Sequence, residues 1–329
     1  MTISVKKIIF TSLASIVFIL WLVSIWWGLL PATYDVKNKA IATAKINNQK
    51  IVPGYTTTTT LIDVTSWLID KPGGFFSNDV TPPGLFMDNM PAFEYGVLEQ
   101  VRDLALVMRL DFSRSQSQST GDKDLESAQE KINISHKNWA LPSAESEYRQ
   151  AIVSLVNYRA RLVAKDQTDA QFYTRADNLN AWLRAVEKRL GSISQRLSLS
   201  VGQDSYNTAL AGDPSAKQST ETAQQTQIKT PWFQIDDVFY ESRGATWAIL
   251  HFLKAVEVDF ADVLEKKNAQ VSLKQIIRDL ESTQEVVWSP VILNGSGFGL
   301  LANHSLVMAN YVSRANAALI DLRRLLEQG

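Results

Sequence analysis

The segment WSPVILNGSGFGLLANHS, residues 288–305, holds the side chains best suited to chemistry. Ser296 lies between two glycines, and His304 follows eight residues later. A serine and a histidine could serve as nucleophile and base in a hydrolase, provided that a carboxylate orients the imidazole. Residues 294–304 are therefore a Gly-rich turn with two weak catalytic candidates.

Known motifs argue against catalysis there. Three glycines alternate over residues 295–299 and precede a predicted helix, as in a phosphate-binding loop. A dinucleotide fingerprint would need glycine at Leu300, and a P-loop would need a lysine that the segment lacks. Ser296 also lacks the G-x-S-x-G spacing of a nucleophile elbow. The segment predicts a tight turn between helices, with Asn303 as the N-cap of the second.

The sequence contains few cysteine or histidine residues that could bind a metal ion or a cofactor. The chain has no cysteine, and its three histidines are His136, His251 and His304. The helical neighbours of His251 at i+3, i+4 and i+7 include no metal ligand, and His136 is predicted to be solvated in a polar loop. We predict no metal site and no cofactor. The acidic residues near 236 suit a helix N-terminus.

The irregular segment KPGGFFSNDVTPPGLFMDNMP, residues 71–91, is the best candidate for a partner-binding surface. Gly-Gly and Pro-Pro pairs interrupt regular structure, and long loops with aromatic residues often bind partners. The equally weighted alternative is a compact loop whose aromatic side chains fill its own core. The candidate residues are Phe75, Phe76, Phe86 and Met87.

The elements that would position these residues begin with an uncharged run of 23 residues, Ile8–Leu30. At about 1.5 Å per residue, a helix of this length crosses a hydrocarbon core of about 30 Å. Cleaved signal peptides have shorter apolar regions, about 7–15 residues, and small residues at the cleavage site. We therefore predict an uncleaved transmembrane anchor that contacts the lipid bilayer. Its interface residues are Lys6, Lys7, Trp26 and Trp27.

Charge favours one orientation and excludes one class of partner. The lysine pair at 6–7 favours an inside N-terminus and an outside domain, whereas four lysines at residues 37–50 oppose it. Without that pair, 31 basic residues face 34 acidic ones, a net charge of −3. Such a domain does not resemble a nucleic-acid binder.

Periodicity and capping residues predict a mainly α fold, in which a bundle-like soluble domain with long polar loops follows the anchor. Residues 56–70 could form a helix or a strand, because threonine runs weaken the helical pattern. The predicted helices cover residues 35–47 (a stalk), 94–110, 144–164, 168–200, 236–267, 272–287 and 303 onward.

A heptad pattern from Phe172 to Leu197 marks the helix 168–200. It could form a coiled coil with another protein, but we favour packing within the molecule, in an antiparallel hairpin with helix 144–164. The predicted organisation is a tail and anchor at 1–30, a helical part at 31–202, a polar linker at 203–230 and a second helical part at 231–329 that packs with the first.

The sequence also resembles a family of bacterial membrane proteins, domain of unknown function 2333. The resemblance spans nearly the whole chain and includes KPGGFFSNDVTPPG, FYTRADNLNAWLRAVEKRLGSISQRLS and WSPVILNGSGFGLLANHSLVMANYVSRANAALIDLRRLL. It implies a bacterial inner-membrane protein, and it carries no activity, cofactor or catalytic residue to transfer.

Together these features favour a single-pass envelope protein that binds or scaffolds another envelope protein or a second copy of itself. Two alternatives stay open. One is a membrane-anchored hydrolase that uses the turn 294–304. The other is a helical bundle that binds a lipid or another ligand in an apolar cavity.

Overall fold

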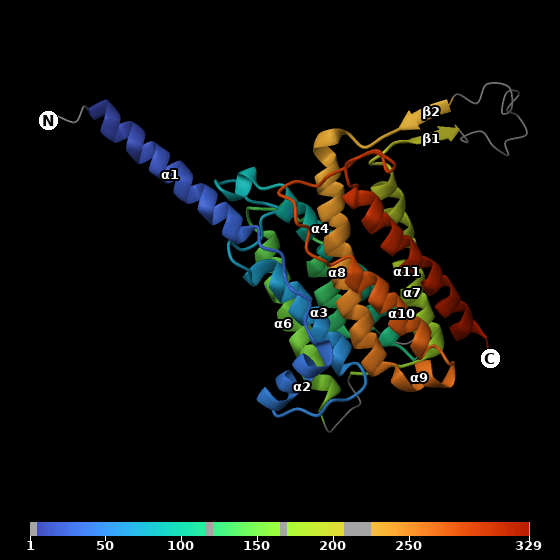
Figure 1. Cartoon of the computed structure of the whole chain (residues 1–329). Coiled ribbons are helices and arrows are strands. Elements are labelled where there is room, and N and C mark those ends of the chain that lie inside the picture. The colour runs from blue at the N-terminus through green and yellow to red at the C-terminus, as the bar shows by residue number, and fades with distance from the viewer. Residues whose placement is uncertain (1–4, 116–120, 165–169, 207–224, 329) are drawn as a thin grey trace, which may run out of the picture.

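The computed structural model describes residues 5–115, 121–164, 170–206 and 225–328. Figure 1 shows an N-terminal helix that projects from a helical bundle. The mainly α fold with an apolar N-terminal helix is therefore confirmed. The helices are α1 (Val5–Trp27), α2 (Val36–Ile46), α3 (Tyr55–Asp70), α4 (Asn89–Val107), α5 (Lys123–Ile132), α6 (Ala144–Leu162), α7 (Ala176–Ser198), α8 (Ile235–Asp259), α9 (Ala261–Lys266), α10 (Gln270–Ser282) and α11 (His304–Glu327).

Short elements complete the described chain. A π-helical turn, η2 (Met108–Phe112), extends α4, and two 3-10 turns are η1 (Gly84–Phe86) and η3 (Trp232–Gln234). Strands β1 (Gln203–Tyr206) and β2 (Gln225–Ile228) pair antiparallel. Both ends of the predicted linker 203–230 thus form a ribbon, and its middle lies outside the described residues.

The threonine-rich segment is a helix, α3, and three of its buried hydroxyl groups bond along the helix. Thr58, Thr60 and Thr65 donate to carbonyl oxygens four residues earlier, at 2.7–2.8 Å. These bonds satisfy buried hydroxyls that a helix would otherwise leave unpaired. The helix-or-strand alternative is thereby resolved.

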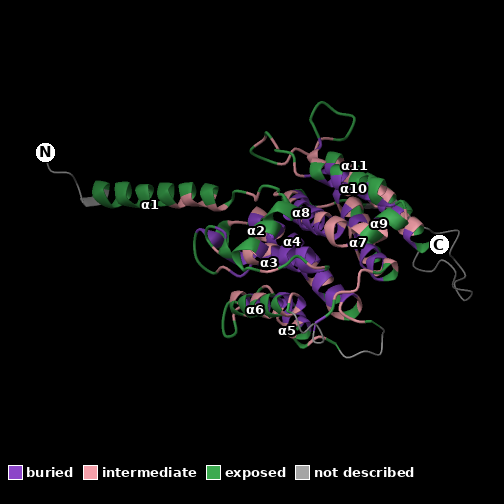
Figure 2. Ribbon diagram, turned by 90° about the horizontal axis from the view of Figure 1, so that it is seen from below, coloured by how far each residue is buried: buried purple, intermediate pink, exposed green. Residues whose placement is uncertain are grey.

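The centre of the bundle is the crossing of α4 and α8, which two glycines bring close together. A Cβ on Gly96 would lie 2.0 Å from the Glu241 carbonyl oxygen, and one on Gly244 would lie 2.0 Å from that of Phe93. Only glycine permits this approach. In Figure 2 the buried residues lie along α4 and α8, whereas α1 is exposed along most of its length.

The heptad residues of α7 pack inside the molecule, chiefly against α11. The predicted hairpin of this helix with α6 is wrong, because α6 packs on α5 and α3 instead. The predicted helix 236–267 is likewise two helices, α8 and α9, which break at Phe260. One hydrophobic cluster contains residues from both 31–202 and 231–329.

Candidate binding site at the base of helix α1

The projecting helix α1 is fixed to the bundle at its C-terminal end. The Trp27 ring packs on Phe76 with the ring centres 5.5 Å apart, and a Cβ on Gly28 would lie 3.8 Å from Met87 Cε. The predicted stalk is α2, which packs on α3 and α8 rather than extending from the anchor. The 71–91 segment is therefore the seat of α1.

A buried ion pair shapes this seat. Lys71 Nζ lies 2.5 Å from Glu94 Oε1, and their side chains are 3% and 0% exposed. The Glu94 carboxylate also accepts hydrogen bonds from the backbone amides of Phe76 and Ser77 and from the Ser77 hydroxyl, at 2.7–3.1 Å. One side chain on α4 thus holds the loop that follows α3.

The Lys71 ammonium has a second set of partners. It donates to the carbonyl oxygens of Leu68 and Gly74 at 2.6 Å each, and it lies 5.0 Å from the Phe76 ring centre. Burial lowers the pKa of Lys71, and the Glu94 carboxylate opposes that shift. The charged form is stable only while the carboxylate is present.

A surface cleft of about 500 Å³ opens beside this loop. Its walls come from residues 76–95, from the connection between α5 and α6, and from the start of α8. The lining residues are Phe76, Ser77, Asp79, Gly84, Leu85, Met87, Asp88, Pro91, Ala92, Tyr95, His136, Lys137 and Asp237.

The cleft carries an acidic wall. Burial raises the pKa of Asp79, and the neighbouring Glu94 and Glu145 carboxylates raise it further. Burial also raises the pKa of Asp237, with added repulsion from Asp236 and Asp88. A cation in the cleft would relieve this repulsion.

His136 forms part of the cleft rather than lying free in solvent. Its ring is half-buried and lies 4.9 Å from the Tyr95 ring centre. Burial lowers the pKa of His136, and the nearby Lys137 lowers it further. The imidazole is therefore neutral at pH 7 and presents an aromatic edge to the cleft.

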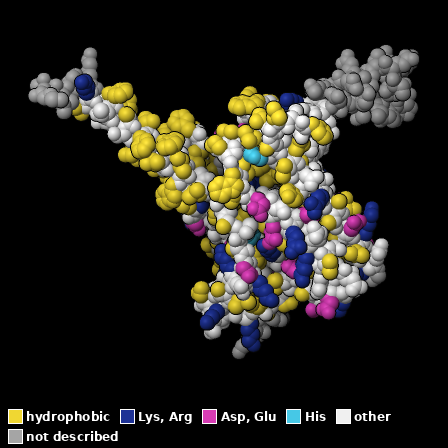
Figure 3. Space-filling view, in the orientation of Figure 1, with side chains coloured by type: hydrophobic (Ala, Val, Ile, Leu, Met, Phe, Trp, Pro, Cys, Tyr) yellow, Lys and Arg dark blue, Asp and Glu magenta, His cyan; other side chains and the backbone are white. Residues whose placement is uncertain are grey.

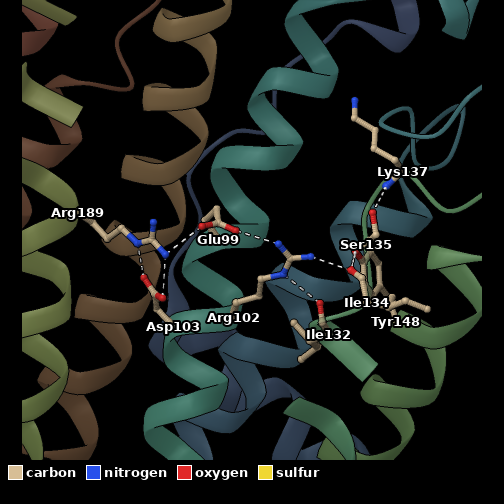
Figure 4. A network of polar contacts seen from close by, with 9 residues as sticks. All are labelled: Glu99, Arg102, Asp103, Ile132, Ile134, Ser135, Lys137, Tyr148 and Arg189. Carbon is tan, nitrogen blue, oxygen red and sulfur yellow. Dashed lines mark hydrogen bonds and ion pairs between the residues drawn. The ribbon is translucent and has the colours of Figure 1, made fainter. Parts of the chain in front are cut away.

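A polar network holds the connection between α5 and α6 in place (Figure 4). Arg102 donates to the carbonyl oxygens of Ile132 and Ile134 at 3.1 and 2.8 Å, and it pairs with Glu99 at 2.9 Å. Arg189 of α7 joins Glu99 at 3.0 Å and Asp103 at 2.6 Å. The rim that carries His136 and Lys137 is thus tied to α4.

The four predicted partner-binding residues divide into two groups. Phe75 and Phe76 are each 2% exposed and fill the core beneath the loop, and of the two only Phe76 reaches the wall of the cleft. Phe86 is 78% exposed, and Met87 is half-buried at the edge of the cleft. The loop both fills its own core and exposes one aromatic ring.

The Gly-rich segment is part of a long connection between α10, which ends at Ser282, and α11, which begins at His304, so the predicted tight turn is wrong, whereas the predicted cap at Asn303 is present. Asn294 bridges to Asn303, whose side-chain oxygen accepts from the Leu306 amide at 2.8 Å and caps α11. His304 Nδ1 accepts a hydrogen bond from the Leu293 amide at 3.1 Å. Ser296 is exposed and makes no hydrogen bond to His304 in this part of the chain. The two catalytic candidates are not brought together.

The remaining histidine is a core residue. His251 Nδ1 lies 2.7 Å from the Trp247 carbonyl oxygen, so that nitrogen carries the proton, and Nε2 accepts from the Tyr34 amide at 3.2 Å. Burial lowers the pKa of His251 to about 4. Among the described residues, no group of three or more His, Asp or Glu side chains could hold a metal ion.

A second surface cleft, of about 720 Å³, lies where α2, α8 and α10 meet. Charged residues share its walls with apolar ones, among them Lys37, Lys254, Glu257 and Lys274. It therefore differs from the apolar cavity expected of a lipid-binding bundle.

Comparison with known proteins places the chain in a family. Residues 2–329 match the family model described as "Uncharacterized protein conserved in bacteria (DUF2333)". The chain belongs to this family. No curated protein and no solved structure matches it. Membership in DUF2333 confirms the resemblance seen in the sequence and assigns no role to the cleft.

Sequence reasoning missed Lys71 and Glu94, although a signal was present. Glu94 lies in the stretch MPAFEYGVL, beside residues whose spacing marks the apolar face of α4. A charged residue on such a face needs a buried partner. Asp79, His136 and Asp237 gave no comparable signal, because distant segments bring them together.

Proposed function

We propose that this protein is a single-pass inner-membrane protein whose helical domain binds another envelope protein at the membrane surface. The observation that carries the proposal is the state of α1. Its apolar segment Lys7–Trp27 is long enough to cross a membrane, and apart from the contact of Trp27 at its end it is left uncovered by the bundle. Burial in lipid is favourable by about 25 cal/mol for each Å² of apolar surface removed from water.

The junction supports an anchor that is retained rather than cleaved. Trp27 and Gly28 contact the 71–91 segment, whose loop is fixed by the Lys71–Glu94 pair. A signal peptide that is removed would have no need of such a seat. The domain is therefore held close to the bilayer, without a long flexible stalk.

The proposed orientation has the N-terminus in the cytoplasm and the domain in the periplasm. Lys7 is at the N-terminal end of the apolar segment. The positive-inside rule favours a cytoplasmic location for the end of a span that carries lysine. A C-terminal alkaline phosphatase fusion should be active in cells. A well-expressed but inactive fusion would refute the orientation.

The cleft lined by Leu85 and Met87 is the proposed binding site for that partner. Asp79, Asp88 and Asp237 line it together with Tyr95, so it suits a basic side chain of another protein. A photo-crosslinking residue at Lys137, on the rim, should trap the partner in cells. The same probe at Val271, an exposed residue of α10, is the matched control.

The charge of the cleft gives the second half of this experiment. An Asp237→Asn change should abolish the adduct at residue 137 and leave the fold intact, because Asp237 is partly exposed. An adduct of equal yield in that variant would show that the acidic wall does not recognise the partner. Equal adducts at 137 and 271 would show that the cleft is not the binding site.

The hydrolase alternative would need a different arrangement of Ser296 and His304. His304 Nδ1 already accepts from the Leu293 amide, and Ser296 is exposed on the connection between α10 and α11. A Ser296→Ala variant that folds but loses function would favour catalysis over binding.

A further inference from the structure

Six aromatic side chains of the helical domain are exposed to solvent. Among the described residues after α1, they are the Trp and Phe side chains with more than half of their surface exposed. We call them the aromatic collar: Phe86 (78%), Trp139 (64%), Trp232 (85%), Phe233 (70%), Trp288 (93%) and Phe298 (106%). Exposed leucines, at 85, 141, 300 and 301, accompany them.

The collar residues come from four separate connections that meet at one end of the bundle. These connections lie between α3 and α4, α5 and α6, β2 and α8, and α10 and α11. Figure 1 shows this end beside the attachment of α1, whereas α2, α9 and the C-terminus lie at the other end. We call it the anchor end.

Contacts between segments agree with that placement. Asn78 Nδ2 donates to the Asn138 carbonyl oxygen at 2.7 Å, which joins the first two connections. Arg243, near the start of α8, donates to the carbonyl oxygens of Gln284 and Glu285 at 2.8 Å each, which joins the last connection to α8.

One connection at the anchor end, between α10 and α11, is uncharged over most of its length. Residues 286–303 contain no Asp, Glu, Lys or Arg. In Figure 3 hydrophobic side chains gather on α1 and over the upper part of the domain, whereas most charged side chains lie lower. Large apolar loops without charged neighbours are unfavourable in water, and they mark an interaction surface.

We propose that the aromatic collar is a second membrane contact, which inserts into the headgroup layer of the bilayer that α1 crosses. The inference rests on the proposed anchor. Trp27 at the end of α1 lies 5.5 Å from Phe76, ring centre to ring centre, so the anchor end is held beside the membrane surface that α1 leaves. Because the collar lies at the end of the bundle where α1 would enter the membrane, we infer that lipid covers the collar.

The chemistry of the collar fits a lipid interface. Trp and Phe rings on loops prefer the headgroup boundary, where an indole ring keeps its N–H in contact with water. The collar comes from four loops around one end, not from one groove that a single helix or strand could fill. These connections contain three lysines, and one of them, Lys71, is buried and paired with Glu94. With Lys137 and Lys229 as the remaining lysines, insertion requires no anionic lipid.

The absence of native cysteine allows a direct test in the full-length protein. Single-cysteine variants Trp288→Cys and Phe298→Cys carry a fluorophore, and the protein is reconstituted in phosphatidylcholine vesicles that contain a headgroup nitroxide lipid. Val271→Cys, at a 79% exposed site, is the matched control on the side of the domain. Phe18→Cys, with a nitroxide on the lipid chain, reports the anchor.

We expect the nitroxide to remove most of the fluorescence at 288 and 298 and to leave that at 271 unchanged. Quenching at 18 without quenching at 288 and 298 would overturn the collar and leave the anchor intact. Absence of quenching at 18 would refute the anchor, and the collar with it. A change in the fluorescence at 298 that depends on protein concentration and not on the nitroxide lipid would show a contact between copies of the protein. That result would also overturn the proposal.

A charge variant provides an independent readout. Phe298→Glu should reduce quenching at a reporter on residue 288, because a carboxylate lacks the preference of an aromatic ring for the boundary between headgroups and acyl chains. Since residue 298 is fully exposed, the substitution should leave folding unchanged. Unchanged quenching at 288 in this variant would contradict the proposal.

Discussion

Replacement of Glu94 by glutamine should destabilise the 71–91 segment, on which α1 is seated, more than any change on the surface of that segment. Glutamine has nearly the same size, so the change removes the charge without opening a cavity. It leaves the Lys71 ammonium, whose side chain is 3% exposed, without its counter-charge at 2.5 Å. It also replaces one carboxylate oxygen by an amide NH₂ group, a donor that cannot accept the hydrogen bonds that the backbone amides of Phe76 and Ser77 donate to Glu94.

The expected loss follows from this geometry. Removal of one partner of a buried ion pair costs about 3–5 kcal/mol. That is a large share of the roughly 5–15 kcal/mol by which domains are stable. Lys71→Met with Glu94→Gln removes both charges, so the double variant should be more stable than Glu94→Gln alone.

The assay is denaturant unfolding of the detergent-solubilised protein, combined with hydrogen exchange of amides 71–88. Exchange there should accelerate in Glu94→Gln and return toward the wild-type rate in the double variant. Asp70→Asn is the control, since the Asp70–Arg149 pair is 54% and 58% exposed and should contribute about 0–1 kcal/mol. A loss in Glu94→Gln no larger than in this control would refute the reasoning.

Three further predictions concern the helical domain. Gly96→Ala should cost about 2–3 kcal/mol of unfolding free energy, because its Cβ would lie 2.0 Å from a backbone oxygen of α8. Gly191→Ala, whose nearest contact would be 3.6 Å away, should instead add about 0.5–1 kcal/mol, and equal effects would contradict the proposed close crossing. Burial lowers the pKa of His251 from 6.5 to about 4 and raises that of Asp259 from 3.8 to about 6. The unfolded state therefore binds the proton of His251 more readily, so its contribution is complete above pH 6.5 and is lost as pH falls toward 4. The folded state binds the proton of Asp259 more readily, so stability from that group falls as pH rises from 3.8 to about 6. Between pH 4 and 6, Asp259→Asn should lose stability on acidification relative to His251→Gln, and parallel melting curves would contradict both shifts. Ser296→Ala should change the unfolding free energy by less than about 0.5 kcal/mol and leave partner crosslinking intact.

Much of the fold follows from local sequence rules. The apolar length of α1, the heptad of α7 and the cap at Asn303 are properties of single segments. Whether the α3 segment is a helix or a strand could be decided only once its burial was known. In the buried helix, the hydroxyls of Thr58 and Thr60 donate to backbone carbonyl oxygens of the helix itself. Local pattern alone could not supply that information.

Long-range pairing was the part that could not be predicted. The connection between α6 and α7 suggested a hairpin, yet the apolar face of α7 packs on α11, which is more than 100 residues away in sequence. Nothing in a heptad specifies which other apolar stripe will cover it.

The candidate site shows the same limit. An irregular loop with aromatic residues was visible, but burial of Phe75 and Phe76 depends on the fold. The cleft needs Asp79, His136 and Asp237 together, and these residues lie on three segments. Of the residues at this site, only Glu94 gave a signal in the sequence. It is a charged residue on the apolar face of α4, which predicts a buried partner of opposite charge.

The central claim is that α1 crosses the inner membrane and holds the domain on its outer side. Impermeant maleimide labelling of single-cysteine variants tests it directly, because the native chain has no cysteine. In cells with a permeabilised outer membrane, Val271→Cys should be labelled at once, and Thr2→Cys only after lysis. Both proteins should remain in the membrane pellet after alkaline carbonate extraction. Release into the supernatant, or labelling of Val271→Cys only after lysis, would contradict the account.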